Sequence, residues 1–271
     1  MLEQWRLFID PAYDGATNMA IDEALLREIG ARVGSPSLRL FRWEPACLSL
    51  GVGQSAKDAD RDLIRQHGWH IVRRLTGGRA ILHTDEITYS VTLPNDHPLV
   101  AGTIVESYRR ISRGLLRALE LLGMVAQAEP QALDAPKLTG PVCFEVPSNY
   151  EIAVDGKKML GSAQVRKHSG MLQHGSLPLT GDLSRICDSL AFADEAERRV
   201  AKERVLSRAI TLHDALGRVV AWDEAADAII RAFEEVFSVE LVSAELTSEE
   251  RQLANELRVT RYATDEWTQR L

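Results

Sequence analysis

The apolar positions of the chain recur at helical spacing in several long segments. Residues 103–106 form a Thr-x-x-Glu capping box, and apolar residues then follow three and four positions apart until Gly123 ends the series. A second capping box, residues 247–250, opens a short charged helix near the C-terminus. The patterns predict helices over residues 17–29, 103–123 and 191–204, and helices that begin near residues 223 and 247.

Short apolar runs of strand length lie between these helices. They cover residues 38–43, 47–50, 69–75, 88–93, 150–154, 158–165 and 172–177. The order is a helix, several strands, a helix, hairpin strands and then helices, which is not the strict strand–helix alternation of a parallel doubly wound sheet. The pattern therefore predicts an α+β fold in which helices flank a mixed, largely antiparallel sheet.

The chain has no internal repeat and no low-complexity linker, so its 271 residues are predicted to form a single domain. A hydrophobic content of 45% is ample for one packed core. We place the catalytic core at about residues 33–240 and a helical C-terminal extension at residues 241–271.

Composition and charge exclude several classes of protein. No stretch approaches the ~20 apolar residues that span a bilayer, and the N-terminus lacks the design of a signal peptide. Cys47, Cys143 and Cys187 are far apart and lack metal-ligand spacing, which argues for a reduced protein without disulfides or a metal. A formal charge of −7 argues against nucleic acid as a partner. We therefore expect a cytoplasmic protein that binds neither membranes nor nucleic acid.

Cys143 lies in a stretch with Gly, Pro and Ser, residues 139–148, that is typical of a loop. A free thiol has a pKa of about 8.5, so little of it is thiolate at pH 7, and a nearby ammonium lowers that pKa. Lys158, fifteen residues further along the chain, is such a cation. The pair predicts a nucleophile with its activating cation, whereas the alternative for a lone cysteine is a small buried hydrophobe.

The dipeptide Asp155-Gly156 is a strong signal for a two-residue β-hairpin turn. Such a turn sets Lys158 opposite Ala153. We expect Lys158 to share a face of the hairpin with Leu160 and to point away from Ile152. By spacing alone, a lysine in that position is solvent-exposed.

A second cluster of candidates follows the predicted strand of residues 69–75. The pair Gly77-Gly78 lets the backbone turn sharply and approach a ligand, with N–H groups available for carbonyl or phosphate oxygens. Such a pair alone is usually just a turn, but here arginines occupy positions 73, 74 and 79 and His83 follows. This setting indicates a ligand that carries an acyl or phosphate group. For His83 and for His174, a packed structural histidine is as good an interpretation as a catalytic one.

Three motifs occur in order along the chain. They are Arg-Arg-x-Thr-Gly-Gly-x-Ala-x-x-His at residues 73–83, Gly-Lys-Lys-x-x-Gly-Ser-Ala-Gln at residues 156–164, and Leu-Gln-His-Gly-Ser at residues 172–176. Together they resemble the lipoate/biotin protein ligase superfamily. Arg79, where lipoate ligases carry a third glycine, and Cys143, which they lack, resemble the protein octanoyltransferases of the Gram-positive type. The segment 261–267 also resembles these enzymes, and the resemblance extends from about Trp5 to Trp267.

The resemblance implies a lipoate/biotin ligase-like catalytic fold and an acyltransferase active in lipoate biosynthesis. Octanoyl-acyl carrier protein is the implied donor, a thioester on Cys143 the intermediate, and a lysine of a lipoyl-carrier protein, such as glycine cleavage H protein, the acceptor. Cys143 and Lys158 are then the catalytic residues, and an apolar tunnel holds the acyl tail. No metal, ATP or other cofactor is implied, and a monomer is the family's usual form. Substrate contacts are expected from Arg73, Thr76, Gly77, Gly78, Arg79, His83, Gly161, Ser162, Ala163, Gln164, His174 and Gly175.

Three alternatives remain open. An amidotransferase that moves octanoyl between two lipoyl carriers would use the same cysteine and lysine. An ATP-dependent lipoate ligase is less favoured, because it forms an acyl-adenylate and needs no cysteine. A module that binds acylated carriers without turnover is disfavoured by the presence of both Cys143 and Lys158.

Overall fold

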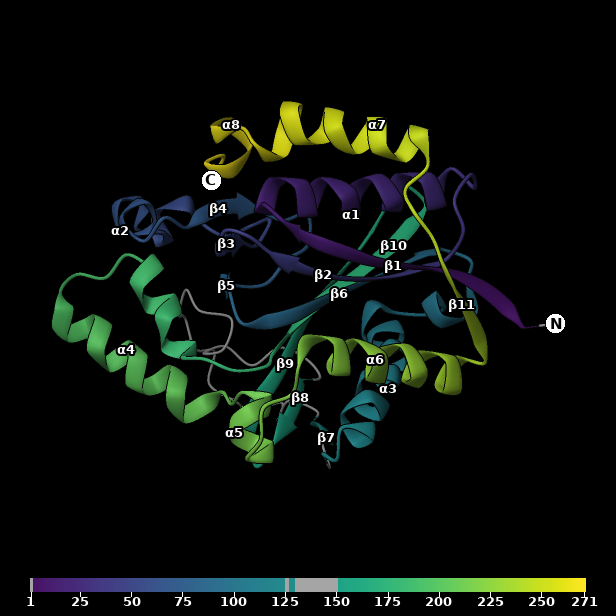
Figure 1. Cartoon of the computed structure of the whole chain (residues 1–271). Coiled ribbons are helices and arrows are strands. Elements are labelled where there is room, and N and C mark those ends of the chain that lie inside the picture. Colours follow the sequence, from purple (N-terminus) through teal and green to yellow (C-terminus); the bar gives the residue numbers. More distant parts are fainter. Residues whose placement is uncertain (1, 125–126, 130–150) are drawn as a thin grey trace.

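The computed structural model describes residues 2–124, 127–129 and 151–271, and its centre is an eight-stranded sheet (Figure 1). The strands run in the order β11 (Val239–Ser243), β1 (Glu3–Tyr13), β2 (Ser37–Trp43), β6 (Glu86–Pro94), β10 (Gly170–Pro178), β9 (Lys157–Lys167), β8 (Glu151–Val154) and β7 (Gln127–Glu129). Strand β1 is parallel to both of its neighbours, and every other pair in this sheet is antiparallel. The predicted mixed, largely antiparallel sheet is confirmed.

A second, smaller sheet has the order β4 (His70–Arg73), β3 (Cys47–Leu50) and β5 (Ile81–His83). Strand β3 is parallel to β4 and antiparallel to β5. The loop between β4 and β5 carries the Gly77-Gly78 pair, so this sheet fixes both ends of the glycine motif.

Helices cover both faces of the large sheet (Figure 1). On one side lie α1 (Gly15–Gly30) and α7 (Ser248–Leu257), and on the other side α3 (Ile104–Leu121) and α6 (Trp222–Phe237). The alternation along β2 explains this arrangement: Leu38 and Leu40 join the core shared with α3 and α6, whereas Phe41 and Trp43 join the core shared with α1 and α7. The remaining helices are short or peripheral: η1 (Ala56–Asp58), α2 (Arg61–Gln66), η2 (Pro98–Val100), η3 (Leu183–Ser189), α4 (Glu195–Arg208), α5 (Leu212–Leu216), η4 (Arg258–Tyr262) and α8 (Asp265–Thr268).

Both predicted capping boxes are present. The N–H of Thr103 donates to the Glu106 carboxylate (2.7 Å) and the N–H of Glu106 donates to the Thr103 hydroxyl (3.2 Å) at the start of α3. The reciprocal bonds of Thr247 and Glu250 open α7 in the same way. Each pair satisfies N–H groups that a helix start leaves without an intrahelical acceptor.

The predicted hairpin turn is also confirmed. Asp155 and Gly156 both have positive φ, 50° and 72°, as a type I′ turn requires, and Lys158 pairs with Ala153 as expected. Beyond this pair the register shifts, because Met159 is an extra residue on β9.

The structure corrects two expectations about this hairpin, the first because of the register shift. Leu160 stands opposite Ile152 and therefore on the same face, not on the opposite one. Lys158 is only 4% exposed, rather than solvated as its spacing suggested. A distant segment pairs with its backbone: Ala209, just after α4, bridges to Lys158, and the N–H of Ile210 donates to the Lys158 carbonyl (3.0 Å).

Strands β1, β5, β7 and β11 were not predicted. Residues before position 33 belong to the same core, since β1 is in the large sheet and α1 packs on it, and β11 crosses the proposed boundary near residue 240. The division into a core and a C-terminal extension stays a prediction. No helix in the described parts of the chain combines the length and apolar character needed to cross a bilayer.

Candidate active site

A narrow cavity lies where α1, the small sheet and strands β6, β9 and β10 meet. Its lining includes the predicted residues His83, Gly161, Ala163, His174 and Gly175. It also includes Met19, Trp43, Ser49, Arg74, Ile81, Thr88 and Ser176. The free volume is about 20 Å³, enough for about one water molecule. The cavity thus brings together residues from all three sequence motifs.

His174 links the glycine loop to α1. Its Nδ1 lies 3.0 Å from an Asp22 carboxylate oxygen, and its Nε2 lies 2.7 Å from the Thr76 hydroxyl. Burial lowers the pKa of His174 despite the neighbouring carboxylate, so the ring is neutral near pH 7. The neutral ring donates from Nδ1 to Asp22 and accepts the Thr76 hydroxyl proton at Nε2.

Asp22 is itself held by several donors. Arg39 Nη1 and the Ser90 hydroxyl both donate to the same carboxylate oxygen, Oδ1, at a distance of 2.9 Å each. Burial by itself raises the pKa of Asp22, but the bond from His174 and the charge of Arg39 outweigh it, and the pKa is lowered. A buried carboxylate therefore fixes the orientation of His174.

His83 belongs to a second cluster of buried, hydrogen-bonded side chains. Its ring stacks on Trp43 with centroids 3.9 Å apart, its Nδ1 lies 2.6 Å from the Glu86 carboxylate, and its Nε2 lies 2.8 Å from the Ser49 hydroxyl. The same Glu86 oxygen accepts from the hydroxyl of Ser176 (2.9 Å). Both ring nitrogens of His83 are thus occupied by protein groups.

Two adjacent arginines are buried and donate to backbone carbonyls. Arg73, which is 0% exposed, donates to the carbonyls of Gly51 (2.8 Å), Gln54 (2.5 Å) and Thr268 (2.7 Å). Arg73 therefore lies behind the glycine loop and acts on the site through that loop. Arg74, in contrast, lines the cavity.

The motif on β9 faces β10 and β6 across the sheet. The Ser162 hydroxyl lies 2.7 Å from the Tyr89 hydroxyl, and Gln164 donates to the Gln173 side chain (3.0 Å), which in turn donates to Tyr89 (2.9 Å). Burial raises the pKa of Tyr89, so its phenol stays protonated. At Gly175 a side chain would meet the Gly161 carbonyl oxygen, so the glycine permits close approach of β9 and β10.

Cys143 lies outside the described residues, and with it the predicted thiol–ammonium pair. Lys158 is placed, and it is buried near the start of β9, between Ala153 of β8 and Ala209 just after α4. The other two cysteines, Cys47 and Cys187, are buried. The pairing of Cys143 with Lys158 stays a prediction.

The C-terminal motif anchors the chain to α1 and to the small sheet. Arg261 and the Tyr262 hydroxyl both donate to the buried Glu23 carboxylate (2.6 Å each). Trp267 donates its indole N–H to the Arg73 carbonyl (2.8 Å). The segment that resembles family members at the C-terminus therefore supports the strand that precedes the glycine loop.

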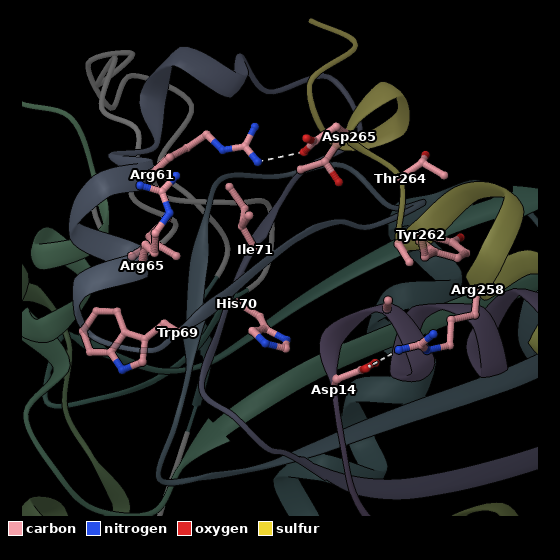
Figure 2. Close-up of a pocket in the computed structure, with 14 residues that line it drawn as sticks. Asp14, Arg61, Arg65, Trp69, His70, Ile71, Arg258, Tyr262, Thr264 and Asp265 are labelled. Atoms are coloured by element: carbon pink, nitrogen blue, oxygen red, sulfur yellow. Dashed lines mark hydrogen bonds and ion pairs between the residues drawn. The ribbon is translucent and has the colours of Figure 1, made fainter.

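A larger cavity, about 360 Å³, lies between the start of α1, α2, β4 and the C-terminal segment (Figure 2). Asp14, Arg61, His70 and Arg258 are among its lining residues, and ion pairs join Arg61 to Asp265 and Arg258 to Asp14. No predicted site residue lines it. The sequence motifs converge at the smaller cavity, which is therefore the candidate site.

Sequence reasoning missed several residues of the site. Asp22 and Glu86, the carboxylates that hold the two histidines, were not singled out, and neither were Ser49 and Trp43. Acidic residues inside an amphipathic helix or an apolar strand are a usable signal, since a buried carboxylate needs a donor. In the described part of the chain, no group of three or more His, Cys, Asp or Glu side chains is arranged to hold a metal ion.

A family model for the lipoyl protein ligase A/B catalytic domain matches residues 14–234, most of the chain. The chain belongs to this family. Octanoyltransferase LipM of an Exiguobacterium species is 42% identical over 97% of this chain and 97% of its own length. Octanoyltransferase LipM of Brevibacillus brevis is 39% identical over 99% of this chain and 100% of its own.

Solved structures agree with this assignment. A bi-partite lipoate protein ligase from Thermoplasma acidophilum, described with its E2 lipoyl domain, has a TM-score of 0.81 at 25% identity and covers 98% of this chain and 96% of its own. A lipoate-protein ligase A bound with ATP has a TM-score of 0.79 at 25% identity, with 99% of each chain covered. The family, the fold class and an acyltransferase enzyme, as predicted from the motifs, are confirmed.

Proposed function

We propose that this enzyme transfers an octanoyl group from octanoyl-acyl carrier protein, through a thioester on Cys143, to a lysine of a lipoyl-domain protein in lipoate biosynthesis. The observation that carries the proposal is the similarity, along nearly the whole chain, to proteins named octanoyltransferase. The acceptor class is supported by the structural neighbour described with its lipoyl domain. Glycine cleavage H protein is the acceptor that we would test first.

The first step is a thioester exchange. The Cys143 thiolate attacks the carbonyl carbon of the donor thioester, the carbon–sulfur bond of the donor breaks, and the carrier leaves as a thiolate that takes up a proton from the Lys158 ammonium, which leaves Lys158 neutral for the second step. One thioester replaces another, so the step is nearly neutral in free energy. Lys158 supports the thiolate by its positive charge. This step requires neither ATP nor a metal.

In the second step the acceptor lysine amine attacks the Cys143 thioester. An amide bond forms, the bond to the Cys143 sulfur breaks, and the amine proton passes to Lys158 or to the departing thiolate. The amide is more stable than the thioester, so this step makes the overall transfer favourable. Backbone N–H groups near Gly77-Gly78 or Gly161-Ser162 stabilise the tetrahedral oxyanion.

The acyl tail is proposed to enter the small cavity. Trp43, Met19 and Ile81 supply apolar surface there, and Gly161 and Gly175 are also part of the lining. Burial of the tail is worth about 0.8 kcal/mol per methylene, roughly 5 kcal/mol for eight carbons. Because the cavity holds only about 20 Å³, the tail has to displace lining side chains, and the unbranched Met19 is the most adaptable of them.

The other predicted substrate contacts remain part of the proposal. Their hydrogen bonds divide them into residues that hold the glycine loop and residues of a polar network on the sheet. His174 and Thr76 hold the glycine loop, and Ser162 and Gln164 belong to the polar network of Tyr89 and Gln173. The proposed substrate-binding residues are Thr76, Gly77, Gly78, Arg79, His83, Gly161, Ser162, Ala163, Gln164, His174 and Gly175. Arg73, predicted as a further contact, is buried and donates to backbone carbonyls, so we propose that it supports the glycine loop instead. A cytoplasmic, monomeric enzyme completes the proposal, and the free thiol of Cys47 is in keeping with a reducing compartment.

The test is to incubate the purified enzyme with octanoyl-acyl carrier protein without ATP and to measure its intact mass before and after hydroxylamine. An octanoyl adduct on Cys143 that hydroxylamine removes is expected, and it should be absent from Cys143→Ser but present in Cys47→Ser. An acceptor is then added, and its acylation follows. If octanoyl-lipoyl domain is a faster donor than the acyl carrier protein, the enzyme is an amidotransferase. If free octanoate plus ATP is required, it is a ligase and the proposal is wrong.

A further inference from the structure

The glycine loop between β4 and β5 turns its carbonyl oxygens toward the small sheet. The carbonyl of Thr76 accepts from the N–H of Val52 (2.8 Å), and those of Gly77 and Arg79 accept from Arg74 Nη2 (2.7 and 2.8 Å). The Gly78 carbonyl packs against Gly51, where a side chain would collide with it. All four carbonyls of the loop therefore face the same way.

The N–H groups of this loop point in the opposite direction to its carbonyl groups, as they do in any trans peptide. Within the parts of the chain that the structure describes, no acceptor bonds to the N–H of Gly77, Gly78 or Arg79. Gly78 has φ of +92°, a left-handed conformation that interrupts the usual alternation of peptide directions. Successive N–H groups around such a residue form a concave nest for an anion.

Arg74 is arranged to hold the loop rather than to bind a ligand by its terminal nitrogens. Nη1 donates to the carbonyl and the hydroxyl of Ser49 (2.9 and 3.2 Å), and Nη2 donates to the Gly77 and Arg79 carbonyls. These bonds use the four terminal N–H hydrogens of the guanidinium. Arg74 is 4% exposed, so its charge lies in a poorly screened environment directly below the loop.

We propose that Arg74 is a positioning residue that orients the N–H groups of Gly77, Gly78 and Arg79 as the oxyanion site of the acyl transfer. The inference rests on the proposed function and chooses this loop over the N–H groups of Gly161-Ser162, which lie in a strand paired with β10. The loop borders the cavity, because Arg74 and His174 both bond to it and both line the cavity. Fixed N–H donors and a buried cation together stabilise the negative oxygen of each tetrahedral intermediate.

Octanal provides a probe of the oxyanion site. The Cys143 thiol adds to its carbonyl, the sulfur bonding to the carbon and the thiol proton passing to the oxygen, and the resulting tetrahedral hemithioacetal places its oxygen where the intermediate has its oxyanion. Octanamide occupies the tail site without forming this adduct. A residue that only maintains the fold affects both inhibitors alike, whereas one that orients the oxyanion donors affects octanal selectively.

In Arg74→Gln we expect kcat/KM for transfer to fall by about 100-fold or more, as when oxyanion donors are removed from other acyl-transfer enzymes. The inhibition constant of octanal should rise by a similar factor, and that of octanamide by less than about threefold. Arg74→Lys should lose less, since one ammonium still reaches one loop carbonyl. Arg110→Gln is the matched control. Arg110 also donates to two backbone carbonyls, those of Leu99 and Ala101, but these residues are not part of the cavity lining.

A second pair of variants keeps the proposal testable if Arg74→Gln does not fold. Gly77→Ala retains the N–H at position 77, and a Cβ there meets no atom within 4 Å, whereas Gly77→Pro deletes the N–H. We expect the proline variant to transfer at least about tenfold more slowly than the alanine variant. Wild-type rates of Cys143 acylation in Arg74→Gln, or equal losses of octanal and octanamide affinity, would overturn this proposal. The mass adduct on Cys143 in the wild-type enzyme tests the proposed function separately.

Discussion

Trp267 and Arg73, which lie 194 positions apart, are joined by a 2.8 Å hydrogen bond from the indole N–H to the backbone carbonyl. Arg73 returns the interaction, since its guanidinium donates to the carbonyl of Thr268, the next residue after Trp267. Strand β4, which leads into the glycine loop, is thus hydrogen-bonded through Arg73 to the C-terminal residues Trp267 and Thr268. The C-terminal motif supports the site although it does not line the small cavity.

We predict that Trp267→Phe lowers the free energy of unfolding by about 1 kcal/mol, the usual net worth of one such hydrogen bond. Transfer activity should fall several-fold, because Arg73 and the loop after it lose a fixed point. Trp222→Phe is the control, since its buried indole N–H has no hydrogen-bond partner among the residues that the structure describes. Urea denaturation and steady-state transfer measure the two effects. Equal activity in both variants would show that the C-terminal contact does not act on the loop.

The parts of the fold that were predictable are those whose cause is local. The two capping boxes and the Asp155-Gly156 turn are set by residues within a few positions of one another, and all three are present. The burial of Lys158 was not predictable in this way, because the segment of Ala209 and Ile210, which pairs with its backbone, lies about 50 residues later in the chain. Strand β1 was missed for a related reason: its partners β2 and β11 pair with it in parallel, without a hairpin to mark it.

The site shows the same division. The motifs identified His174 and Thr76 but not Asp22, because 152 positions separate the carboxylate from the histidine that it orients. Likewise, the sequence indicated that arginines surround the glycine pair, but not that Arg73 points to the C-terminal segment while Arg74 lines the cavity. Residue types at fixed spacing reveal a site, whereas the partners that orient them depend on the folded contacts.

Gly175 allows strand β10 to approach strand β9 closely at the small cavity. A side chain at this position would lie 2.5 Å from the Gly161 carbonyl oxygen and 2.8 Å from a ring carbon of Tyr89. We predict that Gly175→Ala costs about 1–3 kcal/mol of stability by overpacking and reduces transfer at least tenfold by narrowing the cavity. Gly53→Ala, where a side chain meets no atom within 4 Å, should change neither quantity. Thermal unfolding and transfer assays decide between these outcomes, and a fully active Gly175→Ala would remove this strand pair from the acyl site.

The lowered pKa of His174 predicts how stability depends on pH. In the unfolded chain a histidine takes up a proton near pH 6.5, whereas burial keeps His174 neutral in the folded state to lower pH. Between these pKa values the unfolded state binds more protons, so stability falls as the pH drops below about 6.5. The carboxylates with lowered pKa, such as Asp22, act only at more acidic pH, near the unfolded value of about 4.

We therefore predict that the wild-type enzyme loses more stability between pH 7.5 and 5.5 than His174→Gln does. Urea titrations of both proteins at the two pH values give the difference, which isolates His174 from other histidines such as His168, whose pKa burial also lowers. The same pH dependence in both proteins would mean that folding does not change the pKa of His174.

Lys158 and Lys157 are adjacent on β9 but lie in different surroundings. Lys158 is buried, whereas Lys157 is partly exposed and donates from Nζ to the Leu206 carbonyl (3.3 Å). If the Lys158 ammonium lies within about 4–6 Å of the Cys143 sulfur, Lys158→Ala should raise the thiol pKa by about one unit or more. Iodoacetamide alkylation measured against pH detects this shift, and the buried Cys47 and Cys187 are protected from the reagent.

Lys158→Ala should also reduce transfer strongly, and Lys157→Ala should change neither the alkylation profile nor the rate. Lys158→Arg separates the two roles of the ammonium, because arginine keeps the positive charge but does not exchange a proton near neutral pH. It should restore the alkylation profile more fully than the transfer rate. An unchanged alkylation profile in Lys158→Ala would show that another group activates Cys143, and His83 and His174 would then be substituted next.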